Sequence, residues 1–128
     1  MVVSLTISKN RIRRELHELS ITESILSITL EQAKQANAVR VSRVNLIVGE
    51  LAGVVDECVD FYFQLIAKDT VAEGAELSFE HPPTRFRCRD CGNVFVPEGQ
   101  NWTCPGCGKK DFEIISGRDL HIDSIEVE

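Results

Sequence analysis

Two short cysteine pairs constrain the fold of this chain more than any other feature. Cys88 and Cys91 enclose two residues, as do Cys104 and Cys107; a glycine follows each pair, and twelve residues separate the pairs. Two intervening residues make a tight turn, and the glycine tolerates a positive φ that lets backbone N–H groups face the sulfur atoms. Two such turns can surround one tetrahedral ion with four thiolates. The spacing therefore predicts a metal site, with zinc as the default ion.

Three interpretations of the four cysteines fit this spacing. A zinc ion held by four thiolates has no open coordination position, so it would be structural rather than catalytic. Disulfides are the second interpretation, although they are rare in the cytoplasm. Iron is the third, because the pairs resemble the knuckles of rubredoxin, an electron carrier. The loop between them is much shorter than that of rubredoxin, and the chain has no Glu-x-x-His sequence for a di-iron bundle of the rubrerythrin kind.

The segment around the cysteines has little apolar material with which to build a core. Its aromatic side chains are Phe86, Phe95, Trp102 and Phe112. Most of its folding free energy would have to come from the bound ion, which contributes on the order of 10 kcal/mol in small zinc modules. We expect this module to unfold when its metal is removed.

Charge limits the partners that the chain can attract. The net charge of −6 argues against general attraction to nucleic acid or to anionic membranes. The segment 85–110 differs, with five basic and two acidic residues, and Trp102 and Phe95 could stack on bases. A nucleic-acid-binding zinc ribbon is therefore an alternative function. The sequence has no apolar run of membrane-spanning length and no secretory signal, so the expected compartment is the cytoplasm.

Two helices are expected before the cysteines. Ser20 and Glu23 have the spacing of a capping box, and apolar residues recur behind them, which predicts a helix over 20–37. Asp56 is expected to cap a second helix that continues to about residue 69. Cys58, in an apolar helical setting, is expected to be a buried core thiol.

Alternating apolar and polar residues predict three strands. The first covers Val41–Val48, and the second ends near His81 because Pro82 and Pro83 prevent further pairing. A third strand, Leu120–Val127, follows the cysteine module and is expected to return to the sheet of the first domain. His81 and His121 lie at or within these strands and are interpreted as structural.

These elements predict an α+β protein with two helices and a three-stranded sheet, plus a small inserted module of the zinc-ribbon kind. The expected divisions are an N-terminal extension (1–15), an α+β nickel-binding domain (16–84 with 117–128) and a four-cysteine zinc module (85–116). The assignment of nickel to the larger domain depends on a family resemblance.

That resemblance follows four collinear features. His17-Glu18-Leu19-Ser20 precedes the first helix, Val48-Gly49-Glu50-Leu51 follows the first strand, and Glu73-Gly74-Ala75 follows the second helix. The two cysteine pairs and the last strand complete the order. From about residue 16 onward, the chain resembles the HypA/HybF family of hydrogenase-maturation nickel chaperones.

The resemblance implies a nickel site at His17 and Glu18. In the family, this site is built around Met-His-Glu at the amino end, from the imidazole, nearby backbone nitrogens and the terminal amine. Ni(II) favours square-planar, nitrogen-rich ligation, and ligation needs a neutral imidazole, so nickel affinity should fall in acid. Glu50, Asp56 and Glu57 are further candidate oxygen ligands that rank below these two.

The chain departs from the family at this end, because Leu16 stands where the family has its first methionine. One hypothesis is a misassigned start, since a UUG codon is read as leucine but can initiate with methionine; intact-mass measurement would decide. The alternative is that the extension adds a real strand.

The resemblance also implies a non-enzymatic metallochaperone with structural Zn²⁺ and transported Ni²⁺. Its implied partners are a HypB-type GTPase and the precursor of the hydrogenase large subunit. Neither nucleic acid nor a membrane is an expected partner, and a homodimer is compatible with the resemblance. The residues agree with a non-enzyme, because no phosphate-binding glycine loop and no nucleophile beside a histidine is found.

Overall fold

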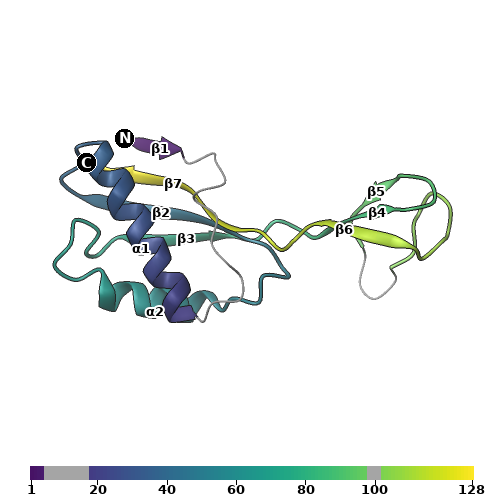
Figure 1. Ribbon diagram of the computed structural model, residues 1–128, viewed down its shortest axis with the longest axis horizontal. Helices are drawn as coiled ribbons and strands as arrows, with labels where there is room; N and C mark the ends of the chain where they lie inside the picture. The colour runs from purple at the N-terminus through teal and green to yellow at the C-terminus, as the bar shows by residue number, and fades with distance from the viewer. Residues whose placement is uncertain (5–17, 98–101) are drawn as a thin grey trace.

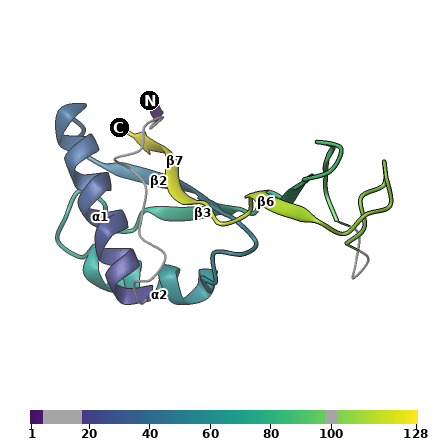
Figure 2. The same cartoon turned by 45° about the vertical axis from the view of Figure 1, so that its right-hand side comes forward.

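The computed structural model describes residues 1–4, 18–97 and 102–128. A larger part, in which two helices pack on a sheet, is joined to a smaller three-stranded sheet (Figure 1). The link is a neck of two chain segments, residues 81–84 and 117–119, which lie side by side in Figures 1 and 2. The α+β class with an inserted small module is confirmed.

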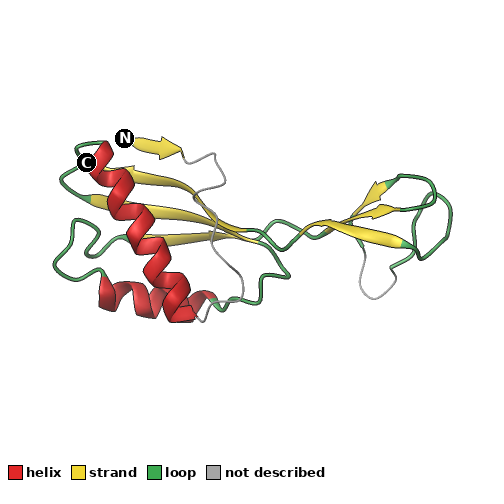
Figure 3. Ribbon diagram, in the orientation of Figure 1, coloured by secondary structure: helices red, strands yellow, loops and turns green. Residues whose placement is uncertain are grey.

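The sheet of the larger part has the strand order β1-β7-β2-β3. Its members are β1 (Val2–Ser4), β2 (Val41–Val48), β3 (Glu76–Glu80) and β7 (Leu120–Val127). β2 and β3 are parallel, and β7 runs antiparallel to β2 and β1. The predicted return of the last strand is therefore confirmed, and the N-terminal extension contributes a fourth strand. α1 and α2 cover one face of the sheet (Figure 3).

The first helix, α1 (Glu18–Gln35), begins before the predicted start. The predicted capping box at Ser20 is wrong, because Ser20 lies inside the first turn of the helix. The hydroxyl of Thr22 donates to the carbonyl of Glu18 at 2.6 Å, so the polar residues here bond back to the preceding turn instead of capping. The helix stops before Asn37, whose φ of 54° is the left-handed conformation of a helix end.

The second helix, α2 (Asp56–Ile66), differs from expectation at both ends. Val55 is the N-cap and makes no side-chain cap hydrogen bond; Asp56 is the first helical residue and is not the cap. The helix ends at Ile66, short of residue 69. Cys58 is exposed, which corrects its interpretation as a core thiol. The face of α2 that packs inward carries Val59 and Phe63, both almost completely buried.

The buried core lies between the helices and the sheet. It is aliphatic with one central aromatic ring, and its largest members are Phe63, Ile21, Ile25, Leu46, Leu120, Ile122 and Ile125. Within the described ranges, no helix is long and apolar enough to cross a membrane.

The smaller part is a sheet of three short strands that sequence patterns did not reveal. β4 (Arg85–Cys88) lies between β5 (Val94–Phe95) and β6 (Phe112–Ser116). Phe86 and Phe112 stack with ring centroids 4.3 Å apart, and Trp102 meets Phe86 edge-on at 5.6 Å. Phe86 and Phe95, together with Cys88 and Cys104, form the small second core, against which Phe112 packs.

A loop of the larger part is fastened to the neck. We call residues 49–51 the clip. The N–H of Gly49 donates to the carbonyl of Asp119, and that of Leu51 to the carbonyl of Gly117, both at 2.7 Å. A carboxylate oxygen of Glu50 also accepts hydrogen bonds from the backbone N–H and the hydroxyl of Thr84. Four hydrogen bonds thus hold the neck at a defined position on the larger part.

Candidate metal centres

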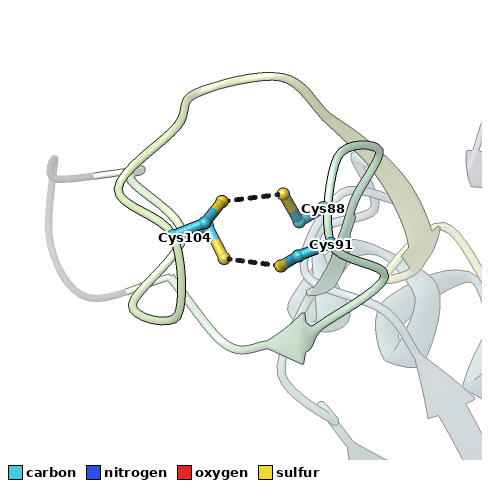
Figure 4. Close-up of side chains that lie close together, drawn as sticks. Cys88, Cys91 and Cys104 are labelled. Carbon is cyan, nitrogen blue, oxygen red and sulfur yellow. Dashed lines mark hydrogen bonds between the residues drawn. The ribbon is translucent and has the colours of Figure 1, made fainter.

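The four predicted cysteines come together at the end of the smaller sheet. Cys88 ends β4, and Cys91 follows in the same turn; Cys104, three residues before Cys107, lies opposite them (Figure 4). The sulfurs of Cys88 and Cys107 are 3.5 Å apart, those of Cys91 and Cys104 are 3.6 Å apart, and all four lie within 4.8 Å of one another. Tetrahedral zinc with bonds of about 2.3 Å places its sulfurs about 3.8 Å apart. The cluster therefore fits a structural zinc site.

The two turns have the same backbone design. Gly92 and Gly108 have φ values of 77° and 76°, the left-handed conformation predicted from their positions. Their N–H groups donate to the carbonyls of Cys88 and Cys104, at 2.9 and 2.8 Å. This repeated geometry explains why the spacing alone identified the site, because each turn is determined by four or five consecutive residues.

Backbone N–H groups stabilise negative charge on the sulfurs. Burial acts to raise the pKa of the Cys104 thiol, but N–H groups of Cys107 and Gly106 bond its sulfur and bring the pKa down to about 6. For Cys107, the N–H of Lys109 lowers the pKa, but contacts with the other three cysteines, Cys88 foremost, and burial raise it to about 12. Contacts among the four sulfurs therefore oppose the ionisation of some of them, while backbone N–H groups favour it. A divalent ion supplies the positive charge that lets all four sulfurs ionise.

One side chain outside the ligand set also supports the cluster. The amide nitrogen of Asn93 lies 3.8 Å from the sulfur of Cys104, and the backbone of Asn93 bonds the sulfur of Cys91. Asn93 thus joins the two cysteine pairs. Cys88 and Cys104 are buried, whereas Cys91 and Cys107 are exposed.

The predicted nickel ligands are only partly visible. His17 lies outside the described residues. Glu18 is the half-buried first residue of α1. A helix N-terminus carries partial positive charge, which disfavours a bare cation, so a cation bound there needs anionic ligands close by.

The lower-ranked carboxylates have other contacts. An oxygen of Asp56 lies 2.6 Å from Nε2 of His81, whose Nδ1 lies 2.9 Å from the carbonyl of Val48. Because that carbonyl can only accept, Nδ1 donates to it, and the Asp56 carboxylate favours a second proton on Nε2. The hydrogen bond to Asp56 accordingly raises the pKa of His81. The carboxylate of Glu50 is bound to Thr84.

Sequence reasoning did not find the His81–Asp56 pair. The pair depends on the parallel register of β2 and β3, which pairs Ile47 with Glu80 and so brings Val48 beside His81. That register is not visible in the sequence.

Most of the basic residues that suggested nucleic-acid binding have acidic partners. Arg89 pairs with Asp111 at 2.9 Å and Arg87 with Glu113 at 3.4 Å, and Lys109 lies 3.7 Å from Asp90. These pairs neutralise the local charge, so the surface is not a free basic stripe of the kind that binds phosphates.

Comparison with known proteins decides the family. Residues 16–127 match the family model described as "Hydrogenase/urease nickel incorporation, metallochaperone, hypA". The chain belongs to the HypA family. The hydrogenase maturation factor HypA of Dehalococcoides mccartyi (strain CBDB1) is 47% identical over 114 residues, covering 88% of this chain and 95% of that protein.

Solved HypA structures share the fold. A solution structure of a HypA protein aligns with a TM-score of 0.71 and 25% identity, covering 88% of this chain and 96% of that one. The solution structure of the Ni metallochaperone HypA from Helicobacter pylori aligns with a TM-score of 0.62 and 24% identity, covering 88% and 97%. The HypA match begins at residue 16, so β1 lies outside it.

Proposed function

We propose that this HypA-family chain binds Ni(II) and delivers it to the precursor of the large subunit of nickel–iron hydrogenase. The observation that carries the proposal is the family match over residues 16–127, which includes both the four-cysteine module and the His17-Glu18 segment. The close relative is a hydrogenase maturation factor, and the Helicobacter pylori structure is that of a nickel metallochaperone.

Nickel is the transported ion in this proposal, and His17 is its principal ligand. The imidazole, with backbone nitrogens next to it, offers the nitrogen-rich set that Ni(II) prefers. Glu18 supplies negative charge at the start of α1 and offsets the unfavourable end of the helix dipole. A site at the edge of a helix can release its ion more easily than a buried one, as delivery requires.

The four cysteines have a different duty. A closed set of four thiolates leaves no position for exchange, so the zinc keeps the module folded and is not delivered. We infer that the chain works without catalysis of its own, in the cytoplasm. Its partners in this proposal are a HypB-type GTPase that assists delivery and the large-subunit precursor that receives the nickel.

Calorimetric titration of the zinc-loaded protein with Ni(II) tests the binding step. We expect one nickel per chain, and at least a tenfold loss of affinity in His17→Ala. His121→Ala is the matched control, because it removes another imidazole, half-buried on β7 and paired opposite Ile47. Its affinity should equal that of the wild type. Absence of nickel binding, or unchanged affinity in His17→Ala, would contradict the proposal.

Transfer is tested separately with the nickel-loaded protein and purified large-subunit precursor. We expect nickel to move to the precursor faster than it moves to a chelator of equal affinity. Equal rates would mean that the chain merely stores the ion.

A further inference from the structure

A cleft of about 550 Å³ lies between the clip and the smaller sheet. Glu50 and Leu51 line it from the clip, Arg118 from the neck, and Trp102 and Ile114 from the smaller part. Apart from Glu50, a lower-ranked candidate nickel ligand, none of these side chains is among the metal ligands discussed above.

The walls of the cleft are apolar and exposed. Trp102 is 50% exposed, Leu51 43% and Ile114 38%, although all three are large hydrophobic side chains. Exposed apolar groups that gather around one hollow mark a binding surface, whereas scattered ones do not. The ring of Trp102 makes edge contacts with Phe86 and Phe112, so it is held in place by the second core.

The rim of the cleft carries one cation without a partner. Arg118 is exposed and forms no ion pair with the residues that the structure describes, in contrast to Arg87 and Arg89 nearby. Glu50, the acidic group of the cleft, is occupied by its two hydrogen bonds to Thr84. Glu50 keeps its negative charge but is directed toward Thr84, so the exposed guanidinium of Arg118 is the charged group left to pair with a ligand, and a guanidinium pairs best with a carboxylate.

The cleft is also formed in advance. The clip is bonded to the neck at Gly117 and Asp119, and these bonds hold Leu51 beside the neck from which the smaller sheet continues. A site that needs no rearrangement loses less free energy on binding.

We propose that this cleft binds a short segment of a partner protein, with a large apolar side chain between Leu51 and Trp102 and a carboxylate on Arg118. Tryptophan and arginine are the residue types that dominate protein–protein binding energy, and an apolar centre beside a charged rim is the usual interface anatomy. The proposal goes beyond nickel delivery, because the cleft can hold such a segment with or without nickel.

Fluorescence titration tests the proposal, because Trp102 is the only tryptophan in the chain. The probe is the blocked peptide acetyl-Asp-Leu-Phe-Asp-amide, and the comparison is the same peptide with lysine in place of aspartate. We expect the acidic peptide to shift Trp102 emission saturably and the lysine peptide to bind at least tenfold more weakly.

Variants assign the contacts. Arg118→Glu should lower the affinity for the acidic peptide at least tenfold and raise the affinity for the lysine peptide. Leu51→Ser should lower the affinity for the acidic peptide severalfold. Lys68→Glu is an equal charge reversal at an exposed position after α2, and it should change the affinity for neither peptide. Circular dichroism of each variant verifies that it is folded.

Three results would overturn the proposal. The first is that Trp102 emission shows no saturable shift up to about 5 mM acidic peptide, a dissociation constant that corresponds to a binding free energy of only about 3 kcal/mol. The second is equal affinity for the two peptides, or an acidic-peptide affinity that Arg118→Glu leaves unchanged. The third is that 3-phenylpropionate, which has a ring and a carboxylate but no peptide backbone, binds as tightly as the acidic peptide, because the cleft would then be a small-molecule site.

Discussion

The contact between Gly49 and Gly117 leads to a sharp stability prediction for Gly49→Ala. A Cβ atom at position 49 would lie 2.2 Å from the carbonyl oxygen of Gly117 and 2.4 Å from its carbonyl carbon. Ordinary van der Waals contact begins at 3.4 Å, so the new methyl group needs more than 1 Å of additional space. Both neighbouring atoms are backbone, and only movement of the neck away from the clip can provide that space.

The cost follows from what this movement breaks. Overpacking of a close contact costs about 1–3 kcal/mol. The hydrogen bonds from Gly49 to Asp119 and from Leu51 to Gly117 would lengthen as well, and each contributes about 1 kcal/mol. We therefore expect Gly49→Ala to lower the free energy of unfolding by about 3–5 kcal/mol, a large part of the 5–15 kcal/mol typical of a domain.

Urea unfolding followed by far-ultraviolet circular dichroism measures this loss, with Gly53→Ala as the control. Gly53 lies in the same loop with a φ of +71°, but a Cβ there would meet nothing within 4 Å. Its substitution should cost only the left-handed backbone penalty, about 1–2 kcal/mol. If Gly49→Ala proves no less stable than Gly53→Ala, the close approach of clip and neck does not exist in solution.

Three further predictions concern the metal, a histidine and a thiol. Removal of zinc with a chelator should unfold the smaller part and shift Trp102 emission to that of unfolded protein, with one Zn(II) per chain restoring it; unchanged emission in protein shown by elemental analysis to be metal-free would contradict this. The His81–Asp56 pair should stabilise the fold below pH 6.5, and this contribution should disappear as the pH rises through the raised pKa of His81. Because His81 is 43% exposed, the effect should be below about 1 kcal/mol, and a urea midpoint of His81→Gln that differs from wild type equally at pH 6 and pH 9 would refute it. Cys58, being exposed, should be the one thiol of the zinc-loaded protein that reacts rapidly with a disulfide reagent, and Cys58→Ser should abolish that reaction; a second rapidly reacting thiol would indicate an open zinc site.

The features that could be predicted from the sequence are those determined over a few neighbouring residues. Each cysteine turn is fixed by consecutive residues, so the spacing predicted both the cluster of four cysteines and the left-handed Gly92 and Gly108. The long strands Val41–Val48 and Leu120–Val127 carry enough alternation to be recognised on their own.

The errors arise where local patterns fit two structures equally well. The spacing of Ser20 and Glu23 suits a cap but also suits the interior of a helix, and the structure has the latter. On α2, the apolar residues around Cys58 suggested a buried thiol, but neighbouring residues point about 100° apart, so the helix can bury Val59 and expose Cys58.

Other features depend on contacts between distant residues. The short strands β4, β5 and β6 have too few residues for a recognisable alternation, and their pairing depends on how the cysteine turns fold. The pair of His81 and Asp56 spans 25 positions and depends on the parallel register of β2 and β3.

The position of β7 affects how the protein can fold during synthesis. This strand lies inside the sheet, between β1 and β2, yet it follows the entire zinc module in the chain. While the ribosome is still adding the module, the nascent larger domain has both helices but an open groove beside β2, with apolar surface exposed to chaperones and to neighbouring chains. Its core closes only when Leu120–Val127 has emerged from the ribosomal exit tunnel. A chain interrupted within the module would therefore leave an unfinished sheet, a natural target for cellular proteolysis.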